Sequence, residues 1–384
     1  GPDPPGLHRV PGLAGPELIA VVGGGLAGLA AAARLSRAGH EVVVLERDAA
    51  PCACVEVATE PGGTVLTLPA AWRDLFRKSG RVLASDLRRR GLQLVAAPPR
   101  RYRLADGSAL DLPTDRGAQW TTLAAAYGEP VAASWRDLLD ELDGAWLVLR
   151  RYGLEEEFSG RLGAADRAVL VPRRSLDDLA RRVPELAELV LDVAARLGQD
   201  PRRLPGWHAY RLGLERTFGR WQVVDAEGVP QPATVLLDLL LERLDTRGVE
   251  VRTGVEVLAI RPDRDGHRLE STAGSLLADA VVSTVDPATH ADLTHERADF
   301  RVARHLRRAP GGGPRWTSWR TLLDLPPLQP AREGVAVASP WSPGGTDSWA
   351  QLLTGALAAY RLHEQLTGED IRPTNRDYRI TPGR

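Results

Sequence analysis

Alternating runs of apolar and polar positions divide the chain into two α/β segments and a helical middle. Residues 17–47 read as a buried strand, a glycine-rich turn, a helix and a second buried strand. From residue 114 to residue 197, apolar positions recur at intervals of three and four, which is the period of an amphipathic helix. A further amphipathic helix over residues 233–247, closed by Gly248, marks the return to α/β character.

Buried strands are expected again over residues 249–252, 255–260, 280–285 and 335–339, and a last helix over 348–366. The pattern therefore predicts an α/β fold in which a discontinuous Rossmann-like domain carries an inserted, mixed and largely helical substrate domain. The expected boundaries place residues 17–92, 230–290 and 333–370 in the first domain and residues 93–229 and 291–332 in the second. Residues 1–16 are expected to be a flexible leader and residues 371–384 a tail.

The turn after the first strand carries glycines at Gly23, Gly25 and Gly28, the spacing G-x-G-x-x-G. The first glycine allows a tight turn, the second lets a pyrophosphate approach the backbone, and the third lets the helix pack closely on the strand. The helix N-terminus adds N–H groups and the positive end of its dipole. Glu46 ends the second strand about 20 residues later, where a carboxylate accepts hydrogen bonds from ribose hydroxyls. This order predicts a dinucleotide site; the alternative is a turn that merely tolerates glycine.

Composition narrows the classes of partner. The chain has 49 Lys and Arg against 50 Asp and Glu, a net charge of −1, so nothing points to nucleic acid. No apolar run is long enough to span a membrane and no secretory signal is visible, so we expect a cytoplasmic location. Cys52 and Cys54 are too few for a disulfide framework. No cluster of further metal ligands lies beside them in the sequence, so no metal site is predicted.

Several segments together resemble the FAD-dependent phytoene-desaturase-like (carotenoid desaturase) branch of the amine-oxidase-type flavoproteins. They cover roughly half of the chain, and the helical middle contributes no such motif. The resembling segments are residues 21–47, 61–76, 214–221, 247–257 with 278–287, and 342–345 with the helix that follows.

The resemblance implies FAD as the cofactor and a role for each matching residue. The three glycines would hold the pyrophosphate, Glu46 the adenosine ribose, and the backbone of Val255 the adenine from a strand edge. The residues implied to bind FAD are Gly23, Gly25, Leu26, Ala27, Gly28, Glu46, Arg47, Val255, Gly345, Thr346 and Trp349.

The helix after Gly345 is implied to point its N-terminus at the pyrimidine end of the flavin ring. Reduced flavin carries negative charge there, and a helix N-terminus stabilises an anion. Ser348 and Gln351 have the spacing of a capping box at the start of this helix. The alternative is a helix that only closes the domain.

Three segments depart from the family pattern. A Gly-Gly-Arg motif is expected shortly after Glu46, where residues 49–57 differ, and a Pro-x-Gly-Gly loop is replaced by residues 225–232. A Gly-Asp or Gly-Ala pair is replaced by residues 338–341. The chain also contains no methionine, which leads to the hypothesis that residues are missing from this sequence. Otherwise these departures affect flavin affinity or the position of the ring.

Glu215 and Arg216 are the candidate catalytic pair. A carboxylate near the substrate would accept a proton as the flavin accepts a hydride, whereas the alternative is a structural ion pair at the domain junction. Trp221, Trp341 and Trp349 are candidates for the walls of an apolar pocket that holds a long or flat substrate.

Two basic runs, residues 88–90 and 301–308, are expected to be solvated surface. Contact with an anionic membrane surface is the alternative, since basic residues combined with a second signal attach proteins peripherally to lipid.

The sequence as a whole predicts an FAD-dependent oxidoreductase that passes a hydride from a substrate C–H to flavin N5. The resemblance suggests desaturation of a small apolar molecule, a polyene or a specialised metabolite. Three alternatives stay open: an amine or amino-acid oxidase, a redox-neutral flavin isomerase, and a non-catalytic flavoprotein-like binding subunit.

Overall fold

The computed structural model describes residues 17–52, 59–60, 63–156, 161–170, 174–232, 234–295, 313–325 and 333–372. The expected leader and most of the expected tail lie outside the described residues.

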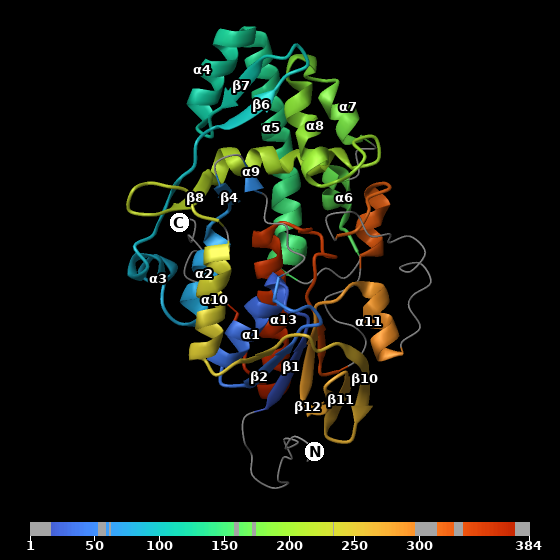
Figure 1. Ribbon diagram of the computed structural model, residues 1–384. Helices are drawn as coiled ribbons and strands as arrows, with labels where there is room; N and C mark the ends of the chain where they lie inside the picture. The colour runs from blue at the N-terminus through green and yellow to red at the C-terminus, as the bar shows by residue number, and fades with distance from the viewer. Residues whose placement is uncertain are drawn as a thin grey trace, which may run out of the picture.

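A parallel five-stranded sheet with the strand order β14-β13-β1-β2-β9 forms one end of the molecule (Figure 1). Its strands come from the distant apolar runs that the sequence pattern singled out, so the discontinuous sheet is as predicted. β1 lies at the centre, and its carboxyl end therefore opens between β13 and β2. The strands are β1 (Leu18–Val22), β2 (Glu41–Leu45), β9 (Glu250–Arg252), β13 (Ala280–Ser283) and β14 (Val335–Val337).

Side chains alternate between the two faces of the sheet along each strand, and a layer of other elements covers each face. Ile19 and Val21 of β1 belong to the cluster that includes the helices α1 (Leu26–Arg37) and α13 (Ser348–Thr367). Ala20 and Val22 face the other way, into a cluster with the antiparallel strands β10 (Val257–Asp263), β11 (Gly266–Ser271) and β12 (Gly274–Ala278). The sheet is thus buried on both faces, which explains its unbroken apolar strands.

Three more helices flank α1 and α13, as Figure 1 shows: α2 (Ala70–Ser79), α3 (Leu83–Arg89) and α10 (Thr234–Thr246). Arg243 of α10 is buried and donates to the Phe76 carbonyl at 3.1 Å, and its guanidinium is paired with Asp86. This ion pair ties α10 to α2 and α3. A helix α11 (Pro287–Thr294) follows β13.

A second, antiparallel sheet has the strand order β3-β4-β8-β5. Its strands are β3 (Thr59–Glu60), β4 (Gly63–Thr67), β5 (Gln93–Ala96) and β8 (Arg220–Val224). The strands β6 (Arg100–Arg103) and β7 (Ala109–Leu112) form a hairpin around a turn at Asp106-Gly107. β4 falls within the range assigned to the first domain but pairs with β8, so the domain boundaries stay a prediction.

Helices fill the far end of the molecule, as the three- and four-residue periodicity predicted (Figure 1). A short 3-10 turn that begins at Pro184 separates two of them. Another 3-10 turn, Gly206–Ala209, leads directly into α9. The helices are α4 (Arg116–Tyr127), α5 (Glu129–Arg150), α6 (Ala164–Leu170), α7 (Leu176–Ala180), α8 (Ala187–Arg196) and α9 (Tyr210–Phe218). Among the described residues, no helix combines the length and apolarity needed to cross a membrane.

Candidate functional site

The glycine turn joins β1 to α1, and each of its motif glycines has a different environment. Gly23 has φ +105°, a conformation that favours glycine, and a Cβ there would overlap the Thr284 hydroxyl. A Cβ on Gly28 would lie inside 3.0 Å of the Gly23 carbonyl oxygen. By contrast, a Cβ on Gly25 would meet no atom of the described residues within 4 Å. The described part of the chain therefore leaves the space beside Gly25 open, as the approach of a pyrophosphate requires.

The N-terminus of α1 supplies hydrogen-bond donors to this open space. The first backbone bond of the helix runs from Leu29 N–H to the Gly25 carbonyl at 3.0 Å. The N–H groups of Leu26, Ala27 and Gly28 precede that bond, so they have no partner within the helix. These three donors and the helix dipole together favour a phosphate.

Glu46 lies beside the turn at the end of β2. Its carboxylate accepts from Gly24 N–H at 2.5 Å and from Asp48 N–H at 2.8 Å. Its carbonyl accepts from Val255 N–H at 2.9 Å, which brings Val255 to the same corner of the sheet. The expected strand over 255–260 begins only at residue 257, so Val255 lies in the loop before β10. Arg47 is exposed and points to Asp48.

The residues predicted around the C-terminal helix meet at the start of α13. Gly345 lies in the preceding turn, and Asp347 rather than Ser348 is the N-cap. The predicted capping box does not form, because the Gln351 amide donates to the Thr346 carbonyl at 2.8 Å. The Asp347 carboxylate instead accepts from Arg211 Nη2 at 2.6 Å and Nε at 3.0 Å. In this ion pair both Arg211 nitrogens donate to the same Asp347 oxygen, and the pair joins α9 to the start of α13. No local sequence pattern indicates it.

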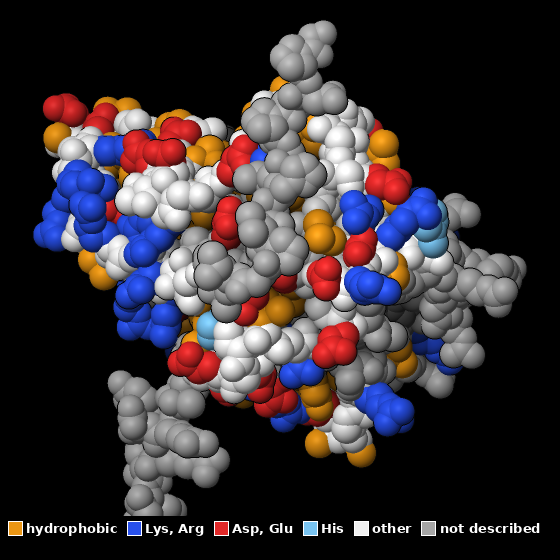
Figure 2. All heavy atoms as spheres, turned by 90° about the horizontal axis from the view of Figure 1, so that it is seen from below, with side chains coloured by type: hydrophobic (Ala, Val, Ile, Leu, Met, Phe, Trp, Pro, Cys, Tyr) orange, Lys and Arg blue, Asp and Glu red, His pale blue; other side chains and the backbone are white. Residues whose placement is uncertain are grey.

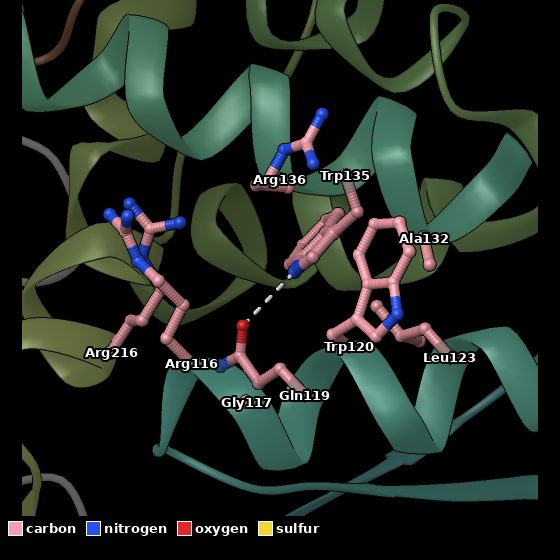
Figure 3. A pocket seen from close by; sticks show the side chains of 9 residues that line it. All are labelled: Arg116, Gly117, Gln119, Trp120, Leu123, Ala132, Trp135, Arg136 and Arg216. Carbon is pink, nitrogen blue, oxygen red and sulfur yellow. Dashed lines mark hydrogen bonds between the residues drawn. The ribbon is translucent and has the colours of Figure 1, made fainter. Parts of the chain in front are cut away.

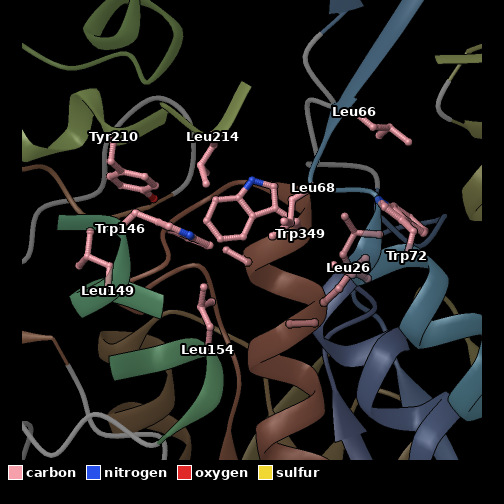
Figure 4. Close-up of a cluster of buried hydrophobic side chains, with 14 of the residues drawn as sticks. Leu26, Leu66, Leu68, Trp72, Trp146, Leu149, Leu154, Tyr210, Leu214 and Trp349 are labelled. Atoms are coloured by element: carbon pink, nitrogen blue, oxygen red, sulfur yellow. The ribbon is translucent and has the colours of Figure 1, made fainter. Parts of the chain in front are cut away.

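An aromatic wall adjoins the same helix start. Trp349 is almost fully buried and meets Trp146 edge to face, with ring centroids 5.6 Å apart. Trp146 in turn stacks on Tyr210 at 5.8 Å. Figure 4 shows Trp349 in the centre of this cluster, with Trp146 and Tyr210 on one side and Leu68 on the other. Of the three tryptophans proposed as pocket walls, Trp349 is the one in this cluster, while Trp221 packs under Arg73.

Several buried polar atoms near Arg211 have no hydrogen-bond partner among the described residues: Trp207 Nε1, His208 Nε2, Tyr210 OH and Ser342 Oγ. Such atoms are costly and call for a group that satisfies them. Together with the open space at Gly25, they fit a cofactor and ligand that bind along this side of the molecule.

The tautomer of His208 follows from its neighbour. Arg211 Nη1 lies 2.9 Å from His208 Nδ1, and a guanidinium can only donate, so Nδ1 is the acceptor and Nε2 carries the proton. Burial, followed by the Arg211 charge, holds the pKa of His208 well below its usual range. His208 is therefore a neutral N–H donor, and it stacks on Trp207 at 4.0 Å.

Glu215 and Arg216 are neighbours in sequence, but their side chains reach different partners. Glu215 is buried and accepts from Arg100 Nη2 at 2.6 Å and from Arg196 and Arg220 at 3.4 Å each. Burial acts to raise the pKa of Glu215, but the charges of Arg196, Arg100 and Arg220 outweigh it and lower the pKa below its ordinary value. The carboxylate is thus a weak base.

Arg216 points away from Glu215 into the helical end. Its Nη2 donates to Asp140 at 2.8 Å and to Asp143 at 3.1 Å, both on α5. Figure 3 shows it next to Arg116 at the edge of a small pocket between α4 and α5, in which the Trp135 indole donates to Gln119 at 3.3 Å. The fold therefore places Glu215 and Arg216 at the junction between elements, but their side chains do not meet in one site.

The remaining candidate chemistry is sparse. Cys52 is half-buried and its Sγ donates to the Gly24 carbonyl at 3.4 Å, and Cys54 lies outside the described residues. Within the described ranges, no group of three or more His, Cys, Asp or Glu side chains could hold a metal ion. Residues 88–90 are exposed on α3 and just after it, as expected, whereas residues 301–308 lie outside the described residues.

Comparisons with known proteins assign the family. A family model for an NAD(P)-binding Rossmann-like domain matches residues 21–89. A family model for flavin-containing amine oxidoreductases matches residues 63–313, more than half of the chain. The chain belongs to this flavin-containing amine oxidoreductase family. The predicted family, the α/β fold class and FAD as the cofactor are thereby confirmed.

Individual relatives refine the comparison. Hydroxyneurosporene desaturase of Cereibacter sphaeroides is 34% identical over 292 residues, which is 70% of this chain and 56% of that protein. Phytoene dehydrogenase of Streptomyces griseus is 35% identical over 154 residues, 38% of this chain and 29% of that protein. Cyclohexylamine oxidase of Brevibacterium oxydans has the same fold, with a TM-score of 0.57 at 14% identity over 91% of this chain and 99% of that one. The chain spans about half the length of the first of these curated relatives.

Proposed function

We propose that the protein is an FAD-dependent oxidoreductase that introduces a double bond into an apolar polyene. The observation that carries the proposal is the open cradle at Gly25, bordered by the three donors of α1 and by Glu46. Membership of the family implies the flavin, and the curated relatives that match the chain include a hydroxyneurosporene desaturase and a phytoene dehydrogenase.

The cradle residues would hold FAD as follows. The N–H groups of Leu26, Ala27 and Gly28 would bind the pyrophosphate, and Glu46 would accept from the ribose hydroxyls. The loop at Val255 would lie beside the adenine. Gly345, Thr346 and Trp349 would border the flavin ring, and the N-terminus of α13 would stabilise negative charge on it. When bound, FAD supplies the acceptor for the hydride.

The aromatic wall would border the substrate. Trp146, Trp349 and Tyr210 are packed against one another near the start of α13, and the polyene would lie along this cluster. The Nε2–H of His208 and the Tyr210 hydroxyl would orient the bound molecules as hydrogen-bond donors. Because its pKa is lowered, we propose that Glu215 positions arginines and that the proton leaves to water rather than to this carboxylate. Arg216 would hold α9 on α5.

The test of this function is an assay with an acyclic, partly saturated carotene in detergent or vesicles. Desaturation lengthens the conjugated system, so the absorption maximum of the product moves to longer wavelength. Peroxide formation with an amine and no spectral change with the carotene would instead favour the amine oxidase alternative. Conversion only with pre-reduced flavin and without net oxidation would favour the isomerase.

We also propose that a basic face brings the protein to anionic membranes, which hold apolar substrates. Figure 2 shows Lys and Arg side chains gathered on the side where α2 and α3 lie in Figure 1. Arg81, Arg88, Arg89 and Arg90 are exposed there, and Val82 beside them is 48% exposed, which adds an apolar signal.

Flotation with vesicles tests this contact. The protein should float with vesicles that contain phosphatidylglycerol, and the variant Arg88→Glu should float less. A matched change on the far β10–β11 turn, Arg264→Glu, should have no effect. Equal flotation with purely zwitterionic vesicles would contradict an electrostatic contact.

A further inference from the structure

Asp347, the N-cap of α13, does not bind its own helix. Its backbone has φ −56° and ψ 140°, and its side chain makes no capping hydrogen bond. Two other aspartate N-caps of this chain do bind theirs. Asp115 accepts from Ala118 N–H at 2.8 Å at the start of α4, and Asp286 accepts from Thr289 N–H at 3.1 Å at the start of α11. These two follow the usual behaviour of an aspartate at this position.

Arg211 explains why Asp347 differs. Its Nη2 and Nε donate to Asp347 Oδ2 at 2.6 and 3.0 Å, and its Nη1 donates to His208 Nδ1 at 2.9 Å. A Cβ on Gly345 would lie 3.3 Å from Arg211 Nη2, so the guanidinium reaches the turn before α13. Arg211 is buried, and a buried charge without a partner is strongly destabilising. The ion pair therefore prevails over the capping bond.

The start of α13 keeps free donors as a result. The first backbone bonds of the helix run from Ala350 and Gln351 N–H to the Asp347 carbonyl, at 3.0 and 3.1 Å. The N–H groups of Ser348 and Trp349 precede these bonds and have no partner among the described residues. A capping carboxylate would accept from Trp349 or Ala350 N–H, the second and third positions of the helix. It would also place a negative charge at this helix end.

We propose that Arg211 is a positioning residue of the flavin site, which neutralises the Asp347 carboxylate and holds it away from the start of α13. The inference rests on the proposed function, which puts the flavin ring at this helix start. The free N–H groups and the helix dipole would then stabilise negative charge on the reduced flavin. Arg211 acts through Asp347 and need not touch the flavin.

The reduction potential of the bound FAD tests this role, because it reports how much more tightly the protein binds reduced than oxidised flavin. It is measured without any substrate, by equilibrating the holoprotein with a redox dye of known potential. In Arg211→Gln the carboxylate is free to turn onto the helix. The binding of reduced relative to oxidised FAD should therefore weaken by roughly tenfold. For a two-electron couple this lowers the potential by about 30 mV.

Removal of the carboxylate should reverse the effect. Asp347→Ala leaves the Arg211 charge and the free N–H groups in place, so the potential should rise above that of the wild type. Alanine is used because asparagine caps a helix about as well as aspartate does. The double variant Arg211→Gln with Asp347→Ala carries neither charge. Its ratio of reduced to oxidised affinity should return to within about threefold of the wild-type ratio.

Arg243→Gln is a matched control on other elements. The side chain of Arg243, like that of Arg211, is 8% exposed, and it is paired with Asp86. This variant should lower the melting temperature because it breaks a buried ion pair. It should leave the potential of the flavin unchanged.

A wild-type potential in Arg211→Gln would overturn the proposal and leave the binding of FAD, and with it the proposed function, intact. A potential in the double variant as low as in Arg211→Gln would also overturn it, since Arg211 would then act on the fold of the site and not through Asp347. If Arg211→Gln does not fold, a potential in Asp347→Ala at or below the wild-type value would overturn the proposal in the same way. A wild type that binds no FAD would instead refute the proposed function, and this inference with it.

Discussion

Two glycines of one motif should respond differently to the same substitution: alanine at Gly28 should mainly reduce stability, and alanine at Gly25 should mainly reduce FAD affinity. At Gly28 an alanine Cβ would lie inside 3.0 Å of the Gly23 carbonyl oxygen and 3.2 Å from Val21 Cγ1. A backbone carbonyl cannot rotate away, so the cost should reach the upper end of overpacking, about 3 kcal/mol. The higher helix propensity of alanine returns at most about 1 kcal/mol. Gly28→Ala should therefore destabilise even the apoprotein by about 2 kcal/mol.

At Gly25 the same Cβ meets no atom within 4 Å in the ranges that the structure describes, and φ is −71°, which alanine adopts freely. The apoprotein should lose only the preference for glycine at an N-cap, about 0.5–1 kcal/mol. The added methyl would instead occupy the approach of the pyrophosphate. FAD affinity should fall by at least about tenfold, or about 1.4 kcal/mol.

Urea unfolding of the apoproteins and fluorescence titration with FAD separate the two effects. Gly144→Ala, in the interior of α5, is a matched control that should stabilise by about 0.5–1 kcal/mol and leave FAD affinity unchanged. Wild-type FAD affinity in Gly25→Ala would refute the assignment of the cradle. Equal loss of apoprotein stability in Gly25→Ala and Gly28→Ala would refute the steric reasoning.

Three further substitutions probe buried or partly buried ionisable groups. Glu215→Gln should cost about 3 kcal/mol, because buried guanidinium groups lose their shared carboxylate. The pKa of Glu215 is lower in the folded protein than in the unfolded chain, so its contribution to stability is present above the unfolded pKa of about 4.3 and is lost as the pH falls below it. The urea midpoint of Glu215→Gln should therefore depend less on pH in that range than the wild-type midpoint does. Asp347→Asn removes the carboxylate that pairs with Arg211, and because Asp347 is partly exposed we expect the free energy of unfolding to fall by about 2 kcal/mol. FAD binding should also weaken. Thermal unfolding with and without FAD measures both effects. The ring of His40 lies 2.8 Å from that of His363, and burial lowers the pKa of His40. The wild type should therefore lose stability as the pH falls below about 6.5. Urea titrations of His40→Gln should show a stability that depends less on pH. A pH profile of His40→Gln that matches the wild type would assign the effect to other groups.

Most of the fold could be predicted from local sequence patterns. The β-α-β unit at residues 17–47 depends on short-range periodicity and glycine spacing, so it could be predicted closely. β8 was missed because its alternating polar residues, Arg220 and Gln222, face a pocket and its pairing with β4 and β5 comes from distant parts of the chain. Val255 was expected in a strand, but its N–H bonds to Glu46 and delays the strand by two residues.

The site was predicted where the motif is contiguous and missed where it is assembled by tertiary contacts. The ion pair of Arg211 and Asp347 joins residues that are 136 positions apart, and no local pattern marks it. Glu215 and Arg216 show the opposite error. Neighbouring residues on a helix point about 100° apart, so they rarely share one site, and these two indeed reach separate partners.

The central claim is that the cradle at Gly25 binds FAD, and the visible absorption spectrum of the purified protein tests it most directly. The account predicts flavin bands in the protein, with FAD released into the supernatant on heating, and weaker flavin bands in Gly25→Ala at the same protein concentration. A colourless protein that takes up no added FAD would contradict the account and would favour a flavoprotein-like binding subunit.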